Sequence, residues 1–241
     1  AGTDADGDTI TYIVASLPSE GTLTDNGTAI TSDDLPKTTS GTDVVYTATS
    51  ETATSDSFTF KVNDGTVDSD AATVTINITL VNEKPVATAQ TVEATEQTAK
   101  EITLAGTDAE GATLTYSIVD QPSNGTVSLD GNTATYTSTS DTATSDSFTF
   151  KVNDGSSDSD AATVTINITA VNDAPTATAQ TVDATEDEAK TITLAGTDAD
   201  GDTITYIVAS LPSEGTLTDN GTAITSDDLP KTTSGTDVVY T

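Results

Sequence analysis

The sequence predicts an all-β protein built from tandem two-sheet sandwich domains. Three observations lead to this prediction: short stretches alternate apolar and polar residues, turn-forming pairs separate these stretches, and the whole pattern returns along the chain. Alternation with a period of two places every second side chain on one face, as in a strand with one buried side. No stretch has the spacing of about 3.6 residues that an amphipathic helix requires.

The internal repeats define the domain organisation. Three blocks recur: residues 1–47 as 195–241, residues 53–65 as 143–155, and residues 69–79 as 159–169. The copies that begin at Ala1, Ala105 and Ala195 are too far apart for solenoid units, so we expect a chain of separate domains. The first copy is longer because it carries Thr22–Tyr46 where the second has the short hairpin Thr126–Tyr136, and we expect this insert to form an extended hairpin.

Two similar linkers mark the domain boundaries, Val81-Asn-Glu-Lys-Pro85 and Val171-Asn-Asp-Ala-Pro175. They predict a domain at 1–84 that lacks its N-terminal strands, a complete domain at 85–174, and a domain at 175–241 that lacks its C-terminal half. We expect the two partial domains to be a slice of a longer chain or to be completed by neighbouring molecules.

Individual strands follow from the alternation within each copy. The apolar faces are Phe58, Phe60 and Val62; Ala72, Val74, Ile76, Ile78 and Leu80; Ile102 and Leu104; and Leu114, Tyr116 and Ile118. Pairs such as Asp64-Gly65, Asn124-Gly125 and Asp130-Gly131 predict the turns between strands. About seven short strands in about 90 residues are typical of an immunoglobulin-like Greek-key sandwich.

The composition excludes several classes of function. The chain has 39 acidic residues against 7 lysines, a formal charge of −32, and it has no Arg, His, Cys, Met or Trp. Nucleic acids and anionic lipids would repel such a chain, so we expect neither as a partner. No apolar run approaches the ~20 residues that span a bilayer, which argues against membrane insertion. Without His or Cys, only metals that prefer oxygen ligands remain, above all Ca²⁺.

The acidic residues gather at the predicted domain ends. The clusters are Asp4, Asp6 and Asp8 with their counterparts Asp108 and Glu110 and Asp198, Asp200 and Asp202; Asn63-Asp64 with Asn153-Asp154; and Asn82-Glu83 with Asn172-Asp173. Close carboxylates repel one another unless water or a cation separates them, and Ca²⁺ takes 6–8 oxygen ligands of this kind. The competing interpretation is that these residues are solvated turn formers, which Asp-Gly and Asn-Asp pairs also are.

Together and in this order, four motifs resemble the cadherin-like repeats of large calcium-dependent bacterial surface adhesins. They are Val171-Asn-Asp-Ala-Pro175, Asp198-Ala-Asp200, Asp146-Ser-Phe148 and Asn153-Asp154-Gly155, followed by a last strand that runs into the linker. The resemblance covers nearly the whole chain. It implies an extracellular or bacterial cell-surface location and Ca²⁺ bound between consecutive domains, with the adjacent repeats of the same chain as partners.

The resemblance also implies two sets of metal ligands. For the second junction they are Glu96, Asp146 (or Asp141), Asn172, Asp173, Asp198 and Asp200; for the first they are Asp56 (or Glu51), Asn82, Glu83, Asp108, Glu110 and Asp154. The first set departs from the family pattern, since Lys84 replaces the alanine of the second linker and Glu110 replaces an aspartate. We therefore expect the second junction to bind Ca²⁺ better.

The function expected from these features is mechanical: a calcium-rigidified extender or stalk segment of an adhesin, and not an enzyme with a small-molecule substrate. The alternative is a subunit of a self-assembling extracellular filament, in which identical chains complete one another by strand donation. A carbohydrate-binding module is disfavoured by the lack of Trp and the few aromatic residues. A spacer within a secreted hydrolase remains a further alternative.

Overall fold

The computed structural model describes residues 2–241, which form β-strands, turns and two short 3-10 helices. Repeat 1 denotes residues 1–84, repeat 2 residues 85–174 and repeat 3 residues 175–241, after the predicted boundaries. The chain forms two compact units, one of Ala1–Thr88, Ala105–Ser117 and Lys151–Ala161, the other of Ala89–Leu104, Ile118–Phe150 and Ala162–Thr241. Within the described residues, no helix is long and apolar enough to cross a membrane.

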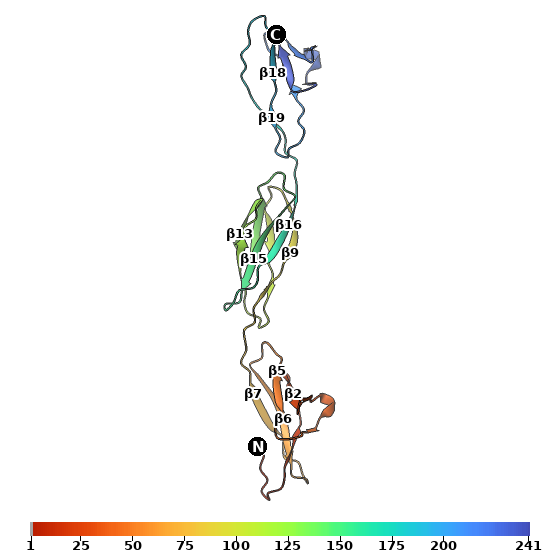
Figure 1. Cartoon of the computed structure of the whole chain (residues 1–241), viewed down its shortest axis with the longest axis vertical. Helices are drawn as coiled ribbons and strands as arrows, with labels where there is room; N and C mark the ends of the chain where they lie inside the picture. Colours follow the sequence, from red (N-terminus) through yellow and green to blue (C-terminus); the bar gives the residue numbers. More distant parts are fainter. Residues whose placement is uncertain (1) are drawn as a thin grey trace. The chain divides into compact units, whose positions relative to one another are not determined.

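Repeat 2 has the most strands, arranged in two main sheets and one short pair. The strands are β8 (Val86–Ala87), β9 (Gln90–Thr95), β10 (Lys100–Thr103), β11 (Gly106–Thr107), β12 (Thr115–Asp120), β13 (Gly125–Asp130), β14 (Thr133–Ser138), β15 (Ser145–Asn153) and β16 (Ala162–Thr169). The main sheets have the orders β12-β15-β16-β9 and β10-β14-β13, and β8 pairs with β11. The pair β16–β9 is parallel, with Val164 opposite Gln90, and Figure 1 shows β9 and β16 on the same side of the repeat.

The core of repeat 2 follows the alternation in the sequence. Phe148, Phe150 and Val152 on β15 are buried, and so are Val164 and Ile166 on β16. Ile102, Leu104 and Tyr136 are buried with them, contributed by β10, the residue that follows it, and β14. The polar residues between these positions, mostly Thr, Ser and Lys, face outward, which is the arrangement expected of strands with one buried face.

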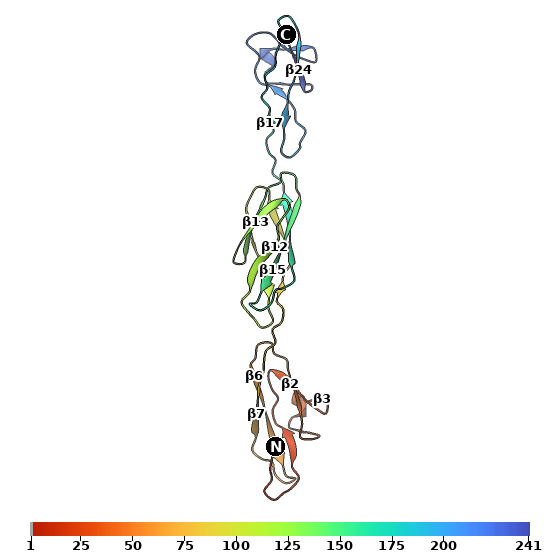
Figure 2. The same ribbon diagram turned by 60° about the vertical axis from the view of Figure 1, so that its left-hand side comes forward.

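Repeat 1 also has two sheets, but its insert is built differently from the expected extended hairpin. The elements are β1 (Thr11–Val14), β2 (Gly21–Asp25), β3 (Thr28–Ala29), η1 (Ser32–Asp34), β4 (Lys37–Thr38), β5 (Val45–Ala48), β6 (Ser55–Asn63) and β7 (Ala72–Asn77). The sheets have the orders β4-β1-β6-β7 and β3-β2-β5, so the insert starts and ends in one sheet, while β4, in its middle, pairs with β1 of the other sheet. Figure 2 shows β6 and β7 on one side of the repeat and β2 and β3 on the other. The prediction of one extended hairpin is therefore wrong.

The same strand sequence is buried to different depths in repeats 1 and 2. Val164 and Ile166 of β16 are fully buried, whereas the corresponding Val74 and Ile76 of β7 are half-buried. Strand β16 has β9 as a neighbour, but β7 is the last strand of its sheet. Leu80 is 37% exposed because β7 ends at Asn77, before the predicted strand does.

Repeat 3 contains three smaller sheets. Its elements are β17 (Thr176–Ala177), β18 (Lys190–Thr193), β19 (Gly196–Thr197), β20 (Ile207–Val208), β21 (Leu217–Asp219), β22 (Thr222–Ile224), η2 (Ser226–Asp228), β23 (Lys231–Thr232) and β24 (Asp237–Tyr240). The orders are β18-β24-β21-β22, β17-β19 and β20-β23. The insert is the same as in repeat 1, since β23 pairs with β20 as β4 pairs with β1.

Candidate metal centre

The second junction places a buried glutamate next to the linker. Glu96 follows β9, and its amide donates to the carbonyl of Thr169 at the end of β16, which extends the parallel pairing by one residue. The side chain is 2% exposed. Its Oε2 accepts from the amide of Val171 at 3.2 Å, and its Oε1 accepts from Nε2 of Gln97 at 3.3 Å. The fold therefore holds this carboxylate against the first residues of the linker.

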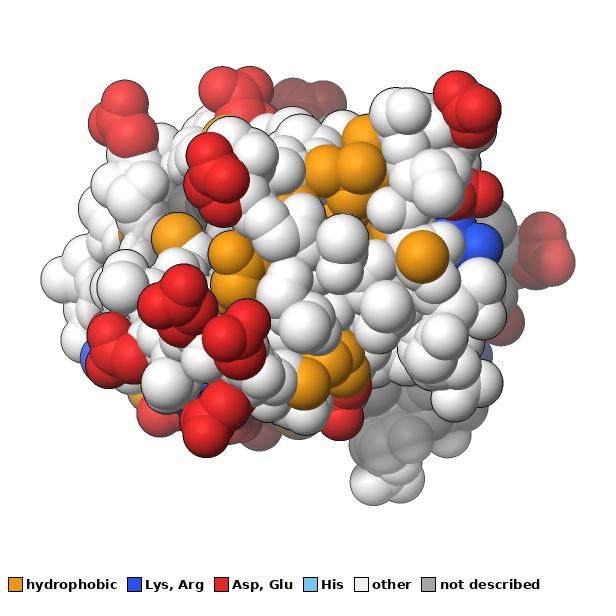
Figure 3. All heavy atoms as spheres, turned by 90° about the horizontal axis from the view of Figure 1, so that it is seen from above, with side chains coloured by type: hydrophobic (Ala, Val, Ile, Leu, Met, Phe, Trp, Pro, Cys, Tyr) orange, Lys and Arg blue, Asp and Glu red, His pale blue; other side chains and the backbone are white. Residues whose placement is uncertain are grey.

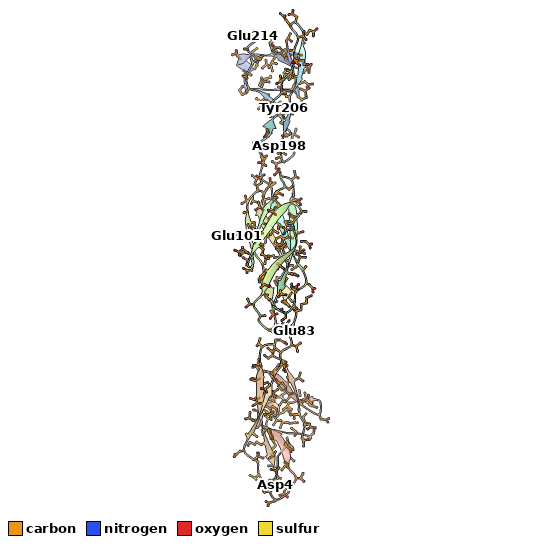
Figure 4. The ribbon with its side chains drawn as sticks, turned by 90° about the vertical axis from the view of Figure 1, so that its left-hand side faces the viewer. Asp4, Glu83, Glu101, Asp198, Tyr206 and Glu214 are labelled. Atoms are coloured by element: carbon orange, nitrogen blue, oxygen red, sulfur yellow. The ribbon has the colours of Figure 1, made fainter. Side chains whose placement is uncertain are left out.

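Two further carboxylates meet Glu96 from the linker and from repeat 3. One carboxylate oxygen from each of Glu96, Asp173 and Asp200 lies within 4.8 Å of the others. The amide of Asp173 donates to Oδ2 of Asp200 at 2.7 Å, which ties the linker to the loop after β19. Asp198, Asp200 and Asp202 form a second group with the same spacing, and Figure 4 labels Asp198 in this loop.

The remaining residues predicted for this junction have different surroundings. The side-chain amide of Asn172 donates to the carbonyl of Asp173 at 2.9 Å, a bond that shapes the linker itself. Gln97, which the sequence analysis did not select, donates to Oδ1 of Asp141 at 3.0 Å and to Oδ2 of Asp173 at 3.4 Å. Of the two alternatives Asp146 and Asp141, the structure therefore brings Asp141 to this group of side chains.

Asp146 instead holds a turn within repeat 2. Its oxygens accept from the amides of Ser123 and Asn124, each at 3.0 Å, and from the hydroxyl of Tyr136 at 3.0 Å. Asp56 makes the same contacts in repeat 1, with Ser19, Glu20 and Tyr46. These hydrogen bonds occupy the oxygens of both aspartates, which leaves neither free to hold a metal ion. Glu51, the alternative to Asp56, is exposed in the loop after β5.

The first junction brings the linker of repeat 1 onto two loops of repeat 2. Nδ2 of Asn82 donates to Oδ2 of Asp154 at 2.9 Å, and the amide of Glu83 donates to Oε2 of Glu110 at 3.1 Å. Figure 4 labels Glu83 in this linker. Nζ of Lys84 lies 2.5 Å from Oδ1 of Asp160, an ion pair on the surface. All these contacts lie within one compact unit of the chain.

Two oxygens at the first junction are buried without a partner. Among the described residues, Oδ2 of Asp108 and Oε1 of Glu110 accept no hydrogen bond. The other oxygens of these carboxylates are used, since Oδ1 of Asp108 accepts from the amide of Ala112 at 2.8 Å and Oε2 of Glu110 accepts from Glu83. A buried carboxylate oxygen without a donor is costly, and a cation removes that cost. The two free oxygens therefore fit a metal ion.

Asp154 differs electrostatically from these unsatisfied acids. The amides of Ser157 and Ser156 and the side chain of Asn82 all donate to its carboxylate, and together they lower the pKa of Asp154 to about 2. These neutral donors stabilise the charged form without any metal. Asp154 thus serves first as the anchor of its own loop and of Asn82.

Both junctions offer the chemistry of a hard cation. The donors are carboxylate oxygens with backbone and amide groups beside them, which is the set that Ca²⁺ takes in proteins. Most of the protein's charge is also negative, and Figure 3 shows acidic side chains over the visible end of the molecule with little lysine among them. Carboxylates within 4.8 Å of one another repel strongly, so a divalent cation would stabilise the arrangement.

Comparison with known proteins identifies the family. The sequence matches the family described as the bacterial Ig domain over residues 1–77, 82–167 and 172–241. The chain belongs to the bacterial Ig-domain family. Three matches in tandem, with the two-sheet fold, confirm the predicted all-β architecture of immunoglobulin-like and cadherin-like repeats. Bacterial Ig domains of this kind are typically structural modules rather than enzymes.

Solved cadherin structures share the fold of these bacterial Ig domains. The protocadherin gamma B4 extracellular domain is 17% identical, with a TM-score of 0.52 over 99% of this chain and 38% of its own. Protocadherin gamma B2 cadherin domains 1–5 are 15% identical, with a TM-score of 0.51 over 99% of this chain and 47% of their own. At such identities the likeness shows the fold alone. No curated protein sequence matches the chain.

A fucoidan endo-hydrolase of glycoside hydrolase family 107 also matches, at 27% identity over 69% of this chain and 24% of its own. Its TM-score of 0.31 is too low to carry an argument about activity. The chain spans only 24% and 38% of the first two structures that it matches.

Proposed function

We propose that the chain is a calcium-rigidified segment of an extracellular stalk or adhesin on a bacterial surface. Membership of the bacterial Ig-domain family and the tandem arrangement support an extracellular structural or adhesive role. Repetition favours a spacer in particular, because a spacer needs length more than it needs distinct surfaces. Residues 1–47 and 195–241 are identical, as expected of a segment that is selected for its length.

The observation that carries the calcium part of this proposal is the group formed by Glu96, Asp173 and Asp200. Its members come from three places: the end of β9, the linker, and the loop after β19. Glu96 is nearly fully buried, and its two oxygens accept hydrogen bonds only from the neutral groups of Val171 and Gln97, so burial of its charge is costly. The unpartnered oxygens of Asp108 and Glu110 support a second site at the first junction.

Bound Ca²⁺ would supply positive charge and a bridge between oxygens of different segments. Without it, the repulsion among Glu96, Asp173 and Asp200 opposes the contact between linker and loops. The bond from the amide of Asp173 to Asp200 is one hydrogen bond to a charged group, which contributes about 1.5–3 kcal/mol. We therefore expect the linker to be mobile at low calcium and held at high calcium.

The paired acids are better explained by this role than by catalysis. A glycosidase also uses two carboxylates, but it needs them around one substrate-binding site. Here, acids in equivalent positions occur at both linkers, and the acids beside them, such as Asp154, are held by backbone amides. The proposed function is therefore structural.

Calcium titration of the full chain tests the proposal. Isothermal titration calorimetry is expected to give a Kd on the order of 10⁻⁴–10⁻³ M, typical of extracellular modules. The melting temperature and the radius of gyration from small-angle scattering should rise over the same range of calcium. Asp173→Asn removes one charge from the group at the second junction and should weaken that site selectively.

A matched control separates site binding from a general charge effect. Asp183→Asn removes the same charge from an exposed residue outside both junctions and should leave the titration unchanged. Equal effects of the two substitutions, or the absence of heat up to ~10 mM calcium, ten times the weakest Kd expected, would show that the acids are only solvated.

A second candidate is a filament in which identical chains donate strands to one another. One observation favours it. Strand β7 is the last strand of its sheet, whereas β16, whose residues 162–167 repeat the sequence of β7, pairs in parallel with β9. Sedimentation velocity of the chain at increasing concentration distinguishes this candidate, because a filament would give growing assemblies and a stalk segment a constant monomer.

A further inference from the structure

The chain contains three Asn-Gly-Thr triplets, and the fold places them in two different environments. Asn26-Gly27 and Asn220-Gly221 form the two-residue turns of the hairpins β2–β3 and β21–β22. Asn124-Gly125 instead leads into strand β13, where Gly125 lies opposite Ser138. The triplets thus have the same local chemistry and differ only in how the fold holds them.

The two hairpin turns are open. Asn26 and Asn220 have left-handed φ angles of 49° and 47°, and both are exposed. A Cβ added at Gly27 or Gly221 would meet nothing within 4 Å. Within residues 2–241, the amide of Gly27 donates no hydrogen bond, and neither does that of Gly221. Each turn therefore leaves an asparagine side chain next to an unobstructed glycine amide.

The third triplet is held on several sides. The amide of Asn124 donates to Asp146 at 3.0 Å, and its side-chain Nδ2 donates to the carbonyl of Ser145 at 3.2 Å. Its carbonyl accepts from Thr139 at 2.9 Å. A Cβ at Gly125 would lie 2.6 Å from the carbonyl of Thr137 and from the ring of Tyr136, so the backbone here is closely packed.

We propose that Asn26 and Asn220 are sites of spontaneous deamidation in the folded chain, and that Asn124 is protected. In this reaction the amide nitrogen of the following glycine loses its proton to a base in solution and attacks Cγ of the asparagine. The new C–N bond closes a succinimide ring, the C–NH₂ bond breaks, and ammonia leaves. Water then opens the ring at one of its two carbonyls and gives aspartate or isoaspartate. Glycine favours the attack because it has no Cβ to obstruct its nitrogen.

Modification would alter the insert of repeats 1 and 3. Each event adds a carboxylate beside Asp25 or Asp219, which are nearly buried and hold Ser40 and Ser234 through two hydrogen bonds each. Isoaspartate also lengthens the backbone by one carbon, which the register Asp25–Thr28 of a two-residue turn cannot accommodate. The packing of the nearby Ile30, which is 6% exposed, would then be weakened.

The experiment is a time course on the native full chain at pH 8. Trypsin cleaves after lysine, so the three triplets fall into different peptides, residues 1–37, 101–151 and 191–231. Mass spectrometry should show Asn26 and Asn220 converting at similar rates, at least about tenfold faster than Asn124, which reacts only when the fold opens. Hydrogen exchange at the amide of Ile30, which donates to Leu23, should accelerate after conversion.

The matched control is the same time course in concentrated urea. Unfolding removes the protection, so the three rates should converge. The proposal is overturned if Asn124 reacts as fast as Asn26 in the native chain, or if the difference between them persists in urea. An unchanged exchange rate at Ile30 after conversion would refute the effect on the insert.

Discussion

Replacement of Tyr136 by phenylalanine should destabilise repeat 2 by an amount that the structure allows us to work out. The hydroxyl donates to Oδ2 of Asp146 at 3.0 Å, and the tyrosine side chain is fully buried. A hydrogen bond to a charged group contributes about 1.5–3 kcal/mol. Because the amides of Ser123 and Asn124 still hold the carboxylate, we expect the lower part of this range, about 2 kcal/mol.

Hydrogen exchange resolved by peptide is the suitable assay, since a chain of several repeats does not unfold in two states. A loss of about 2 kcal/mol corresponds to about 30-fold faster exchange at the slowest amides of β15 and β16. Tyr46→Phe is the matched control, because it removes the same contact with Asp56 from a half-buried tyrosine. Its effect in repeat 1 should be smaller. The reasoning is refuted if the two substitutions have equal effects, or if Tyr136→Phe leaves exchange in repeat 2 unchanged.

The remaining predictions concern pH and packing. Burial and then the bond to Asp146 raise the pKa of Tyr136 from 10.0 to about 12, so its contribution is complete below pH 10 and is lost as pH rises through 12. The alkaline limb of a pH–stability curve should therefore be flatter in Tyr136→Phe. For Asp154, backbone amides and Asn82 lower the pKa from 3.8 to about 2, so its contribution to stability is present above pH 4 and is lost as pH falls through 2. Asp154→Asn should therefore flatten the acid limb of a pH–stability curve. An unaltered acid limb would contradict this. Ile166→Ala should cost about 2–5 kcal/mol in urea unfolding, and Ile76→Ala clearly less, because only Ile166 is fully buried.

Most of the fold could be predicted because it depends on local patterns. The alternation around Phe148 and Val164 specifies strands with one buried face, and the repeats specify their grouping into similar domains. What the sequence did not reveal was the path of the insert, because β4 is only two residues long and pairs with β1, more than twenty residues earlier. The different burial of identical strands was also hidden, since it depends on whether a neighbour such as β9 is present.

The candidate site was predictable only in part. Glu96 and Asp173 come from segments far apart in sequence, and only the resemblance to known repeats indicated that they would meet. Asp146 and Asp56 were selected by the same resemblance, but their oxygens hold turns, a use that depends on Tyr136 and Tyr46. Gln97 carried no signal in the sequence, because it lies outside the acidic clusters and turn-forming pairs from which the ligands were chosen, and its place follows from the left-handed φ of 55° after β9.

The insert that crosses between sheets has a consequence for how the chain folds as it is synthesised. Neighbouring domains of identical sequence tend to exchange strands and misassemble. Repeats 1 and 3 share 47 identical residues, but repeat 2 stands between them and has no strand like β4 beside β12. If adjacent repeats exchanged strands, the short strand β4 or β23 would lose the partner strand with which it pairs at the sheet edge. Alternation of two domain types therefore makes each repeat a poor substitute for its neighbour and favours pairing within the same repeat.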